Sequence, residues 1–381
     1  MPLTVPSTGG PIPGKATRIM YRSTDTHGRP TAVTGTYFEP TQDWKGPGQR
    51  PLITVAPGTQ GQGDQCAPSK LFGQILHYRF PIDLMLEYEI ASVYTLLAQG
   101  IAVVMTDYHG LGTPAVHDYL NREAQGHAVL DALRAAITMT GHTGPTGIFG
   151  YSQGGAAAGS AAELQGTYAP ELDVVGSYVG APPADLRKTL ATSPVVSGLV
   201  PGYVGGFALG LVAYVSNGMM ADYPELREEF NKELNAYGKT WMRQLSHMCI
   251  IETVPNGMFR SERSMTKTGK SVAEVLNSNE KLKEAIDAQR LGSLKPAAPV
   301  FLVSGRNDDV IPYGQVRDLA KDWCGLGATV ELEDTAWIPP FFPYTAAGHL
   351  LPMMPALLQA SEWFKNRLAG KPAPSNCAHL P

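Results

Sequence analysis

Residues 147 to 160, GIFGYSQGGAAAGS, join a short apolar run to a run of small residues. Between the runs lies the pattern G-x-S-x-G, and Ser152 is the only serine of the chain with glycine two positions away on both sides. In this pattern the serine occupies a sharp turn from strand to helix, and its neighbours must be small so that strand and helix can approach each other. The helix N-terminus then directs backbone N–H groups at the point where negative charge develops during acyl transfer. The stretch therefore predicts a nucleophilic Ser152, with a polar residue in a glycine-rich turn as the plainer alternative.

Strands and helices are expected to alternate on both sides of this serine. Apolar and β-branched runs predict strands at 32–38, 51–56, 101–107, 147–149, 174–179, 298–305 and 328–333. Helical spacing of apolar residues predicts helices at 84–98, at 119–139, from 154, at 314–324 and at 350–369. This alternation predicts an α/β fold with a mostly parallel central sheet and helices on both faces.

The alternation is interrupted between residues 187 and 292, where no convincing strand is found. The stretch 195–215 carries no charge and is long enough to span a membrane. Pro201 and several glycines favour short, broken helices instead, so no transmembrane segment is expected. The rest of the insertion has polar, helical stretches. We expect 1–186 and 293–381 to form the catalytic domain and 187–292 to form a helical cap.

The composition of the chain disfavours some binding partners and indicates where the protein works. Lysine and arginine total 30 against 34 acidic residues, which leaves no basic footprint for nucleic acid. The N-terminus has no basic segment followed by an apolar core, so we expect no signal peptide in this chain. Four widely spaced cysteines form no C-x-x-C pair, which disfavours zinc. Their even number and the low charge favour two disulfides in a secreted enzyme over free thiols in a cytosolic one.

A serine nucleophile needs a base and an acid, which follow it in the order Asp or Glu, then His. Beyond the insertion only His349 and His379 remain as candidates for the base. His379 lies in a tail without a preceding strand, so His349, in a small-residue loop before the last helix, is expected to be the base. The acid is expected after the strand at 298–305, where Asp308 is preferred over Asp309.

Five segments carry a resemblance to a known family: APGTQGQGDQCAPS (56–69), GYSQGG (150–155), GAPPADL (180–186), NDDVIP (307–312) and AGHL (347–350). In this order and spacing, over nearly the whole chain, they resemble the secretory lipase family, whose fold is an α/β-hydrolase with a helical lid. The resemblance implies Ser152 as nucleophile, Asp308 as acid and His349 as base, with no metal or organic cofactor. It also implies an ester substrate, an acylglycerol or a similar molecule, met at a lipid–water interface.

The resemblance further implies an oxyanion hole made of two backbone N–H groups. One belongs to Gln153, the residue after the nucleophile. The other comes from the loop PGTQG, where counting back from the motif at Cys66 indicates Gln60 and leaves Thr59 as the alternative. A family member carries an acidic residue at this point, but a backbone donor survives a change of side chain.

An acyl pocket is expected between the uncharged half of the insertion and the segment AWIPPFFPY at 336–344. The candidate substrate-binding residues are Thr59, Tyr151, Phe207, Leu211, Phe341 and Phe342. The alternative is that these apolar stretches only pack the core. His109, in DYHGLG, is expected to border the site without acting as a base.

Four cysteines allow three pairings, of which we predict Cys66–Cys249 and Cys324–Cys377. The first disulfide would tie the oxyanion loop to the insertion, and the second would tie the C-terminal tail to the end of a helix. The expected activity is that of a secreted triacylglycerol lipase or carboxylesterase. The alternatives are an esterase, polyester hydrolase or acyltransferase acting on another substrate, and a non-catalytic binding module of the same fold.

Overall fold

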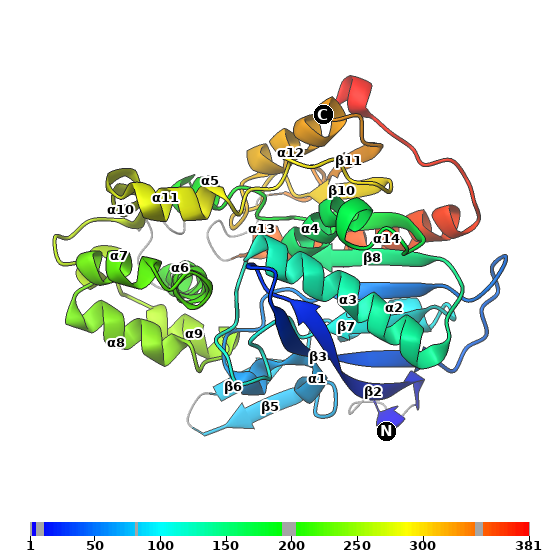
Figure 1. The fold of residues 1–381 in the computed structure, drawn as a ribbon, viewed down its shortest axis with the longest axis horizontal. Helices are drawn as coiled ribbons and strands as arrows, with labels where there is room; N and C mark the ends of the chain where they lie inside the picture. Colours follow the sequence, from blue (N-terminus) through cyan, green and yellow to red (C-terminus); the bar gives the residue numbers. More distant parts are fainter. Residues whose placement is uncertain (1, 5–10, 81–82, 193–202, 340–345, 381) are drawn as a thin grey trace.

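The computed structural model describes residues 2–4, 11–80, 83–192, 203–339 and 346–380. Its centre is a nine-stranded sheet of order β1-β2-β3-β7-β4-β8-β9-β10-β11, beside a hairpin of β5 and β6 (Figure 1). The strands are β1 (Pro2–Thr4), β2 (Pro11–Thr24), β3 (Pro30–Pro40), β4 (Leu52–Ala56), β5 (Leu76–Arg79), β6 (Asp83–Leu86), β7 (Ala102–Thr106), β8 (Thr146–Tyr151), β9 (Val174–Gly180), β10 (Val300–Ser304) and β11 (Val330–Asp334). The helices are α1 (Pro68–Leu71), α2 (Ile90–Leu97), α3 (Arg122–Thr140), α4 (Gln153–Tyr168), α5 (Leu186–Thr192), α6 (Tyr203–Asp222), α7 (Leu226–Glu233), α8 (Ala236–Leu245), α9 (Ile250–Gly257), α10 (Val272–Ser278), α11 (Glu280–Asp287), α12 (Tyr313–Gly325), α13 (Ala347–Leu350) and α14 (Met353–Leu368).

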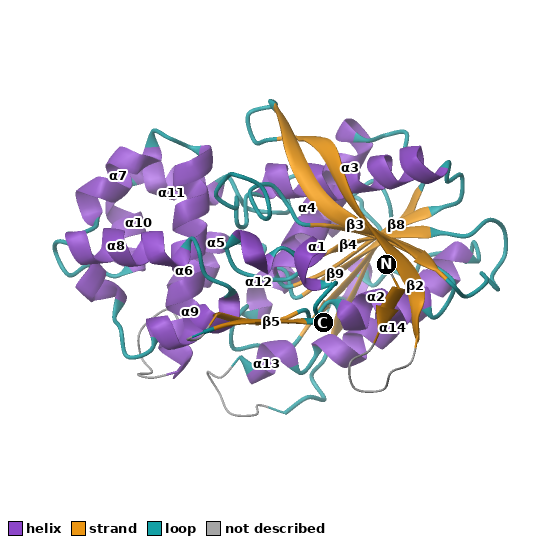
Figure 2. Ribbon diagram, turned by 90° about the horizontal axis from the view of Figure 1, so that it is seen from below, coloured by secondary structure: helices purple, strands orange, loops and turns teal. Residues whose placement is uncertain are grey.

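The sheet is parallel from β7 through β4, β8, β9 and β10 to β11, and antiparallel among β1, β2, β3 and β7. Successive residues of a buried strand face opposite sides, as β4 shows: Leu52 packs with α3 and α4, whereas Ile53 packs with α2 and α14. Helices therefore cover both faces of the sheet (Figure 2), and the predicted α/β architecture is confirmed.

Helices α6 to α11 form a layer beside the sheet (Figure 1), and their apolar core also includes residues outside the layer, such as Leu71 and Met85. Across the described part of the insertion, no strand is present. The expectation of short, broken helices in its apolar half is wrong for residues 203–215, because α6 runs for 20 residues. Residues 195–202 of that stretch lie outside the described part of the chain. Its glycines allow close packing instead: a Cβ at Gly210 would lie 2.2 Å from the side chain of Thr253. None of the helices in the described ranges is long and apolar enough to cross a membrane.

Other boundaries differ from the predictions for local reasons. The predicted helix at 84–98 is divided between β6 and α2, because the hairpin with β5 takes up its first residues. The predicted helix at 350–369 is interrupted at Pro352, which caps α14 and separates it from α13. Strand β2 was not predicted; it lies toward one edge of the sheet, where polar residues such as Arg18 and Arg22 face solvent and conceal the apolar alternation.

Both disulfides of the structure have the predicted pairing. Cys66–Cys249 joins the segment after β4 to the start of α9, with 5.4 Å between the Cα atoms. Cys324–Cys377 joins the end of α12 to the tail, with 5.5 Å between the Cα atoms. The tail is also held by Asn376, whose side chain exchanges two hydrogen bonds with the backbone of Leu332.

Candidate active site

Ser152 stands between the end of β8 and the start of α4, as the sequence pattern predicted. Its backbone has a φ of 60° and a ψ of −122°, a strained conformation for a residue with a side chain. The backbone N–H of Ser152 donates to the carbonyl of Gly180 at 2.9 Å, which holds the turn against the end of β9. Strain of this kind is characteristic of functional sites, because the surrounding structure must compensate for it.

The glycines around Ser152 are required by contacts between backbones. A Cβ atom at Gly150 would lie 2.0 Å from the carbonyl oxygen of Gly154, and one at Gly154 would lie 2.0 Å from that of Ala56. At Gly155 the same addition would lie 2.1 Å from the carbonyl oxygen of Gly180. No side chain fits at these distances, so helix α4 reaches the sheet only because all three residues are glycine.

Three side chains from distant parts of the chain form a hydrogen-bonded series at this turn. Nε2 of His349 lies 2.8 Å from Oγ of Ser152, and Nδ1 of His349 lies 2.7 Å from Oδ2 of Asp308. The other oxygen of Asp308 accepts from the backbone N–H groups of Val310 and Ile311 at 2.9 and 2.7 Å. With its proton on Nδ1, the imidazole can accept the hydroxyl proton of Ser152 at Nε2.

The surroundings of His349 hold the imidazole in place. His349 is buried and lies in the short helix α13 rather than in the predicted loop. The hydroxyl of Tyr151 donates to the carbonyl of His349 at 2.7 Å, and Asp309 accepts from the N–H of Ala346 at 2.9 Å. Burial, followed by the nearby charge of Asp308, raises the pKa of Asp309. Asp309 thus supports the segment before His349 and does not contact the imidazole.

Backbone N–H groups are available on two sides of Ser152. Gln153 is the first residue of α4, where an N–H has no acceptor within the helix. In the loop after β4, neither Thr59 nor Gln60 has a hydrogen-bond acceptor for its backbone N–H among the described residues. Thr59 lines the cavity beside Ser152, whereas the side chain of Gln60 is buried away from it. Both residues therefore remain candidates for the second donor.

This loop rests on two neighbouring residues at the start of α2. The N–H of Gly58 donates to the carboxylate of Glu89 at 2.8 Å, and the hydroxyl of Tyr88 donates to the carbonyl of Thr59 at 2.9 Å. Burial raises the pKa of Glu89 to about 7. Sequence reasoning missed both residues, because they lie in a segment that was predicted to be an ordinary helix.

The cavity beside Ser152 is mostly apolar and lies between the sheet and the α6 layer. It is lined by Thr59, Tyr119, Leu120, Ser152, Gln153, Pro183, Leu186, Thr189, Leu190, Ala208, Leu211, Val212, Val215, Val310 and Ile311. Thr59 and Leu211 were predicted here. Val310 and Ile311 could have been found because they follow the predicted acid, whereas Tyr119 has no local signal.

The other predicted substrate-binding residues are placed differently. Tyr151 does not line the cavity; its ring packs beneath the site with its hydroxyl on His349. The side chain of Phe207 lies outside the described residues, as do Phe341 and Phe342. His109 does not line the cavity either, and its imidazole faces Asp118 instead.

Comparisons with known proteins identify the family of the chain and proteins of similar fold. The family model described as "Secretory lipase" matches residues 80–376. A "Probable inactive lipase MT1628" of Mycobacterium tuberculosis (strain CDC 1551 / Oshkosh) is 28% identical over 371 residues, which cover 95% of this chain and 75% of that protein. "Secreted triacylglycerol lipase LIP3" of Malassezia restricta is 28% identical over 331 residues, which cover 84% of this chain and 65% of that protein.

Two solved structures are similar in fold. Candida antarctica lipase A superposes with a TM-score of 0.73 at 20% identity, covering 96% of this chain and 79% of that chain. The rice cell wall degrading esterase LipA of Xanthomonas oryzae superposes with a TM-score of 0.75 at 20% identity, covering 92% and 90%. At this level of identity the likeness concerns the fold.

Proposed function

Because the chain belongs to the secretory lipase family, we propose that it is a secreted serine hydrolase that cleaves carboxylic esters of lipid-like acyl chains, acylglycerols above all. The observation that carries the proposal is the hydrogen-bonded series Ser152–His349–Asp308 at a strained turn. Family membership supports ester hydrolysis, and the two disulfides support a protein that works outside the cell.

In the proposed mechanism, Oγ of Ser152 attacks the ester carbonyl while Nε2 of His349 takes its proton. Asp308 holds the imidazole in the required tautomer and stabilises its charged form. The N–H of Gln153 and that of Thr59 or Gln60 stabilise the oxyanion. His349 then returns the proton to the leaving alcohol, and a water molecule, activated in the same way, releases the acid from the acyl-enzyme.

The walls of the site support an apolar acyl group. The cavity beside Ser152 shares Leu190, Val212 and Val215 with a second, larger apolar cavity inside the α6–α11 layer. An acyl chain longer than the first cavity therefore has apolar surface to follow into this layer. We propose that residues 187–292 act as the cap of the site, and that 1–186 and 293–381 form the catalytic domain.

An exposed apolar stripe lies directly beside the proposed base. Leu350, Met354 and Leu358 recur every four residues along α13 and α14, and each is about half exposed or more. Met354 and Leu358 are four residues apart on α14 and therefore lie on one face of that helix, and Leu350, at the end of α13, adds a third exposed apolar side chain next to His349. We propose that this stripe meets the lipid–water interface.

A second candidate is a non-catalytic binding module, which the similarity to a "Probable inactive lipase" favours. The two candidates differ in the reactivity of Ser152. A fluorophosphonate probe should label the protein at Ser152, and Ser152→Ala should abolish labelling without changing the circular dichroism spectrum. Absence of labelling in the folded wild-type protein would favour the binding module.

The substrate class requires a panel of esters. We expect hydrolysis of p-nitrophenyl esters from acetate to palmitate and of emulsified triolein, and loss of both in Ser152→Ala. Met354→Asp should reduce triolein hydrolysis and spare the soluble acetate ester, whereas Glu362→Gln, at a charged surface position of the same helix, should spare both. Faster transfer to an added alcohol than to water, or cleavage of a polyester alone, would contradict the lipase assignment.

A further inference from the structure

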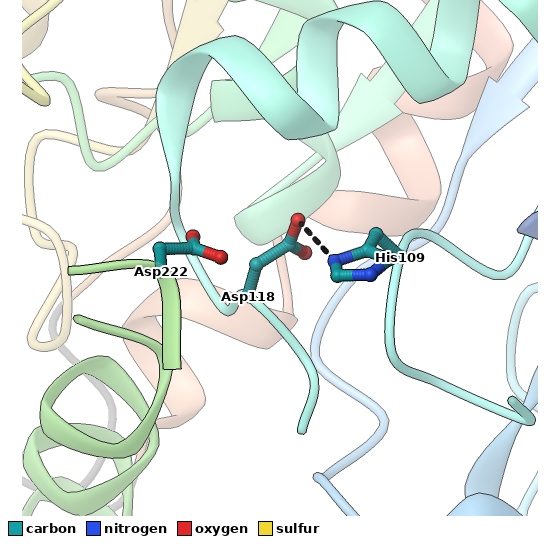
Figure 3. A group of neighbouring side chains, drawn as sticks. All are labelled: His109, Asp118 and Asp222. Carbon is teal, nitrogen blue, oxygen red and sulfur yellow. Dashed lines mark ion pairs between the residues drawn. The ribbon is translucent and has the colours of Figure 1, made fainter. Parts of the chain in front are cut away.

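Three side chains that take no part in the proposed mechanism gather where the catalytic domain meets the cap. His109 and Asp118 come from the segment after β7, and Asp222 is the last residue of α6. Figure 3 shows Asp118 between the other two, with its carboxylate directed at the imidazole of His109. One ligand-type atom from each residue lies within 4.8 Å of the other two.

These atoms lack ordinary partners. Asp118 is fully buried, yet among the described residues neither of its carboxylate oxygens has a hydrogen-bond partner, and neither has Nδ1 of His109. In the same part of the chain, the ion-pair contacts of Asp118 are with two histidine nitrogens at 3.4 Å, one from His109 and one from His117. Buried polar groups nearly always form hydrogen bonds, so three atoms of one cluster that have none, and only these 3.4 Å contacts, point to a further ligand.

The charges of the cluster indicate that this ligand is a cation. Within the described ranges, no lysine or arginine nitrogen lies within ion-pair distance of Asp118 or Asp222. The two carboxylates are buried, and the nearest neutral donor is the amide of Asn121, which donates to Asp222 at 2.6 Å. Among the described residues, only His109 and His117 could place a positive charge beside Asp118, each at 3.4 Å. Two buried carboxylates are costly unless a metal ion or protons compensate for them.

The donor set and its spacing favour one class of cation. In a tetrahedral zinc site with metal–ligand bonds of about 2.0–2.2 Å, neighbouring ligand atoms lie about 3.3–3.6 Å apart. Nδ1 of His109 and Oδ2 of Asp118 are 3.4 Å apart. One imidazole and two carboxylates suit zinc, whereas calcium and magnesium prefer sets made of oxygen alone. Asn121 would orient the Asp222 carboxylate from outside the ligand set.

We propose that His109, Asp118 and Asp222 bind one zinc ion that fastens the end of α6 to the catalytic domain. Helix α6 carries Leu211, Val212 and Val215 of the proposed acyl cavity, so the ion holds one wall of that cavity in register. The site is also linked to the oxyanion donor: Nε2 of His117 lies 2.9 Å from the side chain of Gln153. The lack of C-x-x-C pairs disfavours a zinc site made of cysteines and does not bear on histidine and aspartate ligands.

Zinc binding can be measured without reference to ester hydrolysis. The full chain is stripped with EDTA, exchanged into chelator-free buffer and titrated with ZnCl₂ by calorimetry, and retained metal is counted by mass spectrometry after gel filtration. We expect one zinc per chain and a rise in Tm on addition of zinc. Substitution with cobalt should give the intense visible bands of a four-coordinate ion.

Variants assign the ligands. Asp118→Asn, Asp222→Asn and His109→Gln should each weaken zinc binding by more than about a hundredfold, since each removes a direct ligand. Asp25→Asn, a nearby carboxylate that contributes no ligand atom, should bind zinc as the wild type does. Circular dichroism tests whether each variant is folded. If Asp118→Asn does not fold, the milder variant Asp222→Asn provides the test of the ligand set. The proposal is overturned if the wild type retains no zinc at micromolar ZnCl₂, if folded ligand variants bind as tightly as wild type, or if magnesium or calcium displaces zinc.

Discussion

Oδ2 of Asp308 lies 2.7 Å from Nδ1 of His349, whereas the neighbouring Asp309 directs its carboxylate at the backbone N–H of Ala346. Two adjacent aspartates thus have different partners in the same loop. One orients the proposed base directly, and the other supports the segment that precedes it. This difference distinguishes their expected effects on catalysis.

Asp308→Asn should lower kcat for p-nitrophenyl butyrate by about 10⁴-fold, because an amide favours the wrong tautomer of His349. Asp309→Asn should cost about tenfold or less, since its amide oxygen can still accept from Ala346. Steady-state kinetics on both folded variants tests this. A larger loss in Asp309→Asn would mean that the acid is assigned to the wrong residue.

Glu89 should make stability depend on pH. Burial raises its pKa to about 7 in the folded protein, from the ordinary value of 4.5 for an exposed glutamate side chain. Between these values the folded protein keeps a proton that the unfolded chain has released, so the free energy of unfolding falls as pH rises. Glu89 therefore contributes about 3 kcal/mol to the free energy of unfolding below about pH 4.5, and this contribution is lost above about pH 7.

Urea unfolding of the wild type and of Glu89→Gln at several pH values between 4.5 and 7.5 isolates this contribution. The difference between the two unfolding free energies should change across the window, because glutamine does not titrate. Parallel curves would show that Glu89 titrates normally. The glutamine should keep most activity, since its oxygen can still accept from the N–H of Gly58.

The two disulfides should differ in their effect on activity. Cys324→Ser with Cys377→Ser should lower the free energy of unfolding by about 2–5 kcal/mol and leave kcat of the folded enzyme unchanged. Cys66→Ser with Cys249→Ser should lower both the free energy of unfolding and kcat, because residues 61 and 249 form a β-bridge beside the proposed oxyanion loop. Urea unfolding and kinetics at a temperature where both variants are folded make the comparison. Equal kcat values in the two variants would contradict it.

Leu211→Arg should reduce hydrolysis of palmitate esters far more than hydrolysis of acetate esters, because Leu211 lines the cavity beside Ser152. Phe259→Arg makes the same kind of change at an exposed position between residues 187 and 292 and should affect the hydrolysis of neither ester. The pH dependence of kcat should be unchanged in both. Equal losses on short and long esters in Leu211→Arg would mean that this residue only stabilises the fold.

The local sequence was sufficient to predict the strand–turn–helix unit around Ser152. The reason is steric: the glycines at 150 and 154 are required by the close approach of α4 to the sheet, so the pattern and the structure express the same constraint. Buried parallel strands such as β7 were also predictable, because both of their faces are apolar. The order of Ser152, Asp308 and His349 along the chain followed from the connectivity of the fold.

Tertiary structure alone decided which groups act together across long separations. Asp308 and Asp309 have the same chemistry in sequence, and only the path of the loop brings one of them to His349. Glu89 has a raised pKa because it is buried against Gly58, in a loop that lies 31 residues earlier in the chain, so the shift depends on tertiary packing. His109, Asp118 and Asp222 form no motif, since their ligand atoms meet only when the end of α6 packs against the segment after β7. Local patterns specify local geometry, whereas charge, burial and hydrogen-bond partners depend on segments that folding brings together.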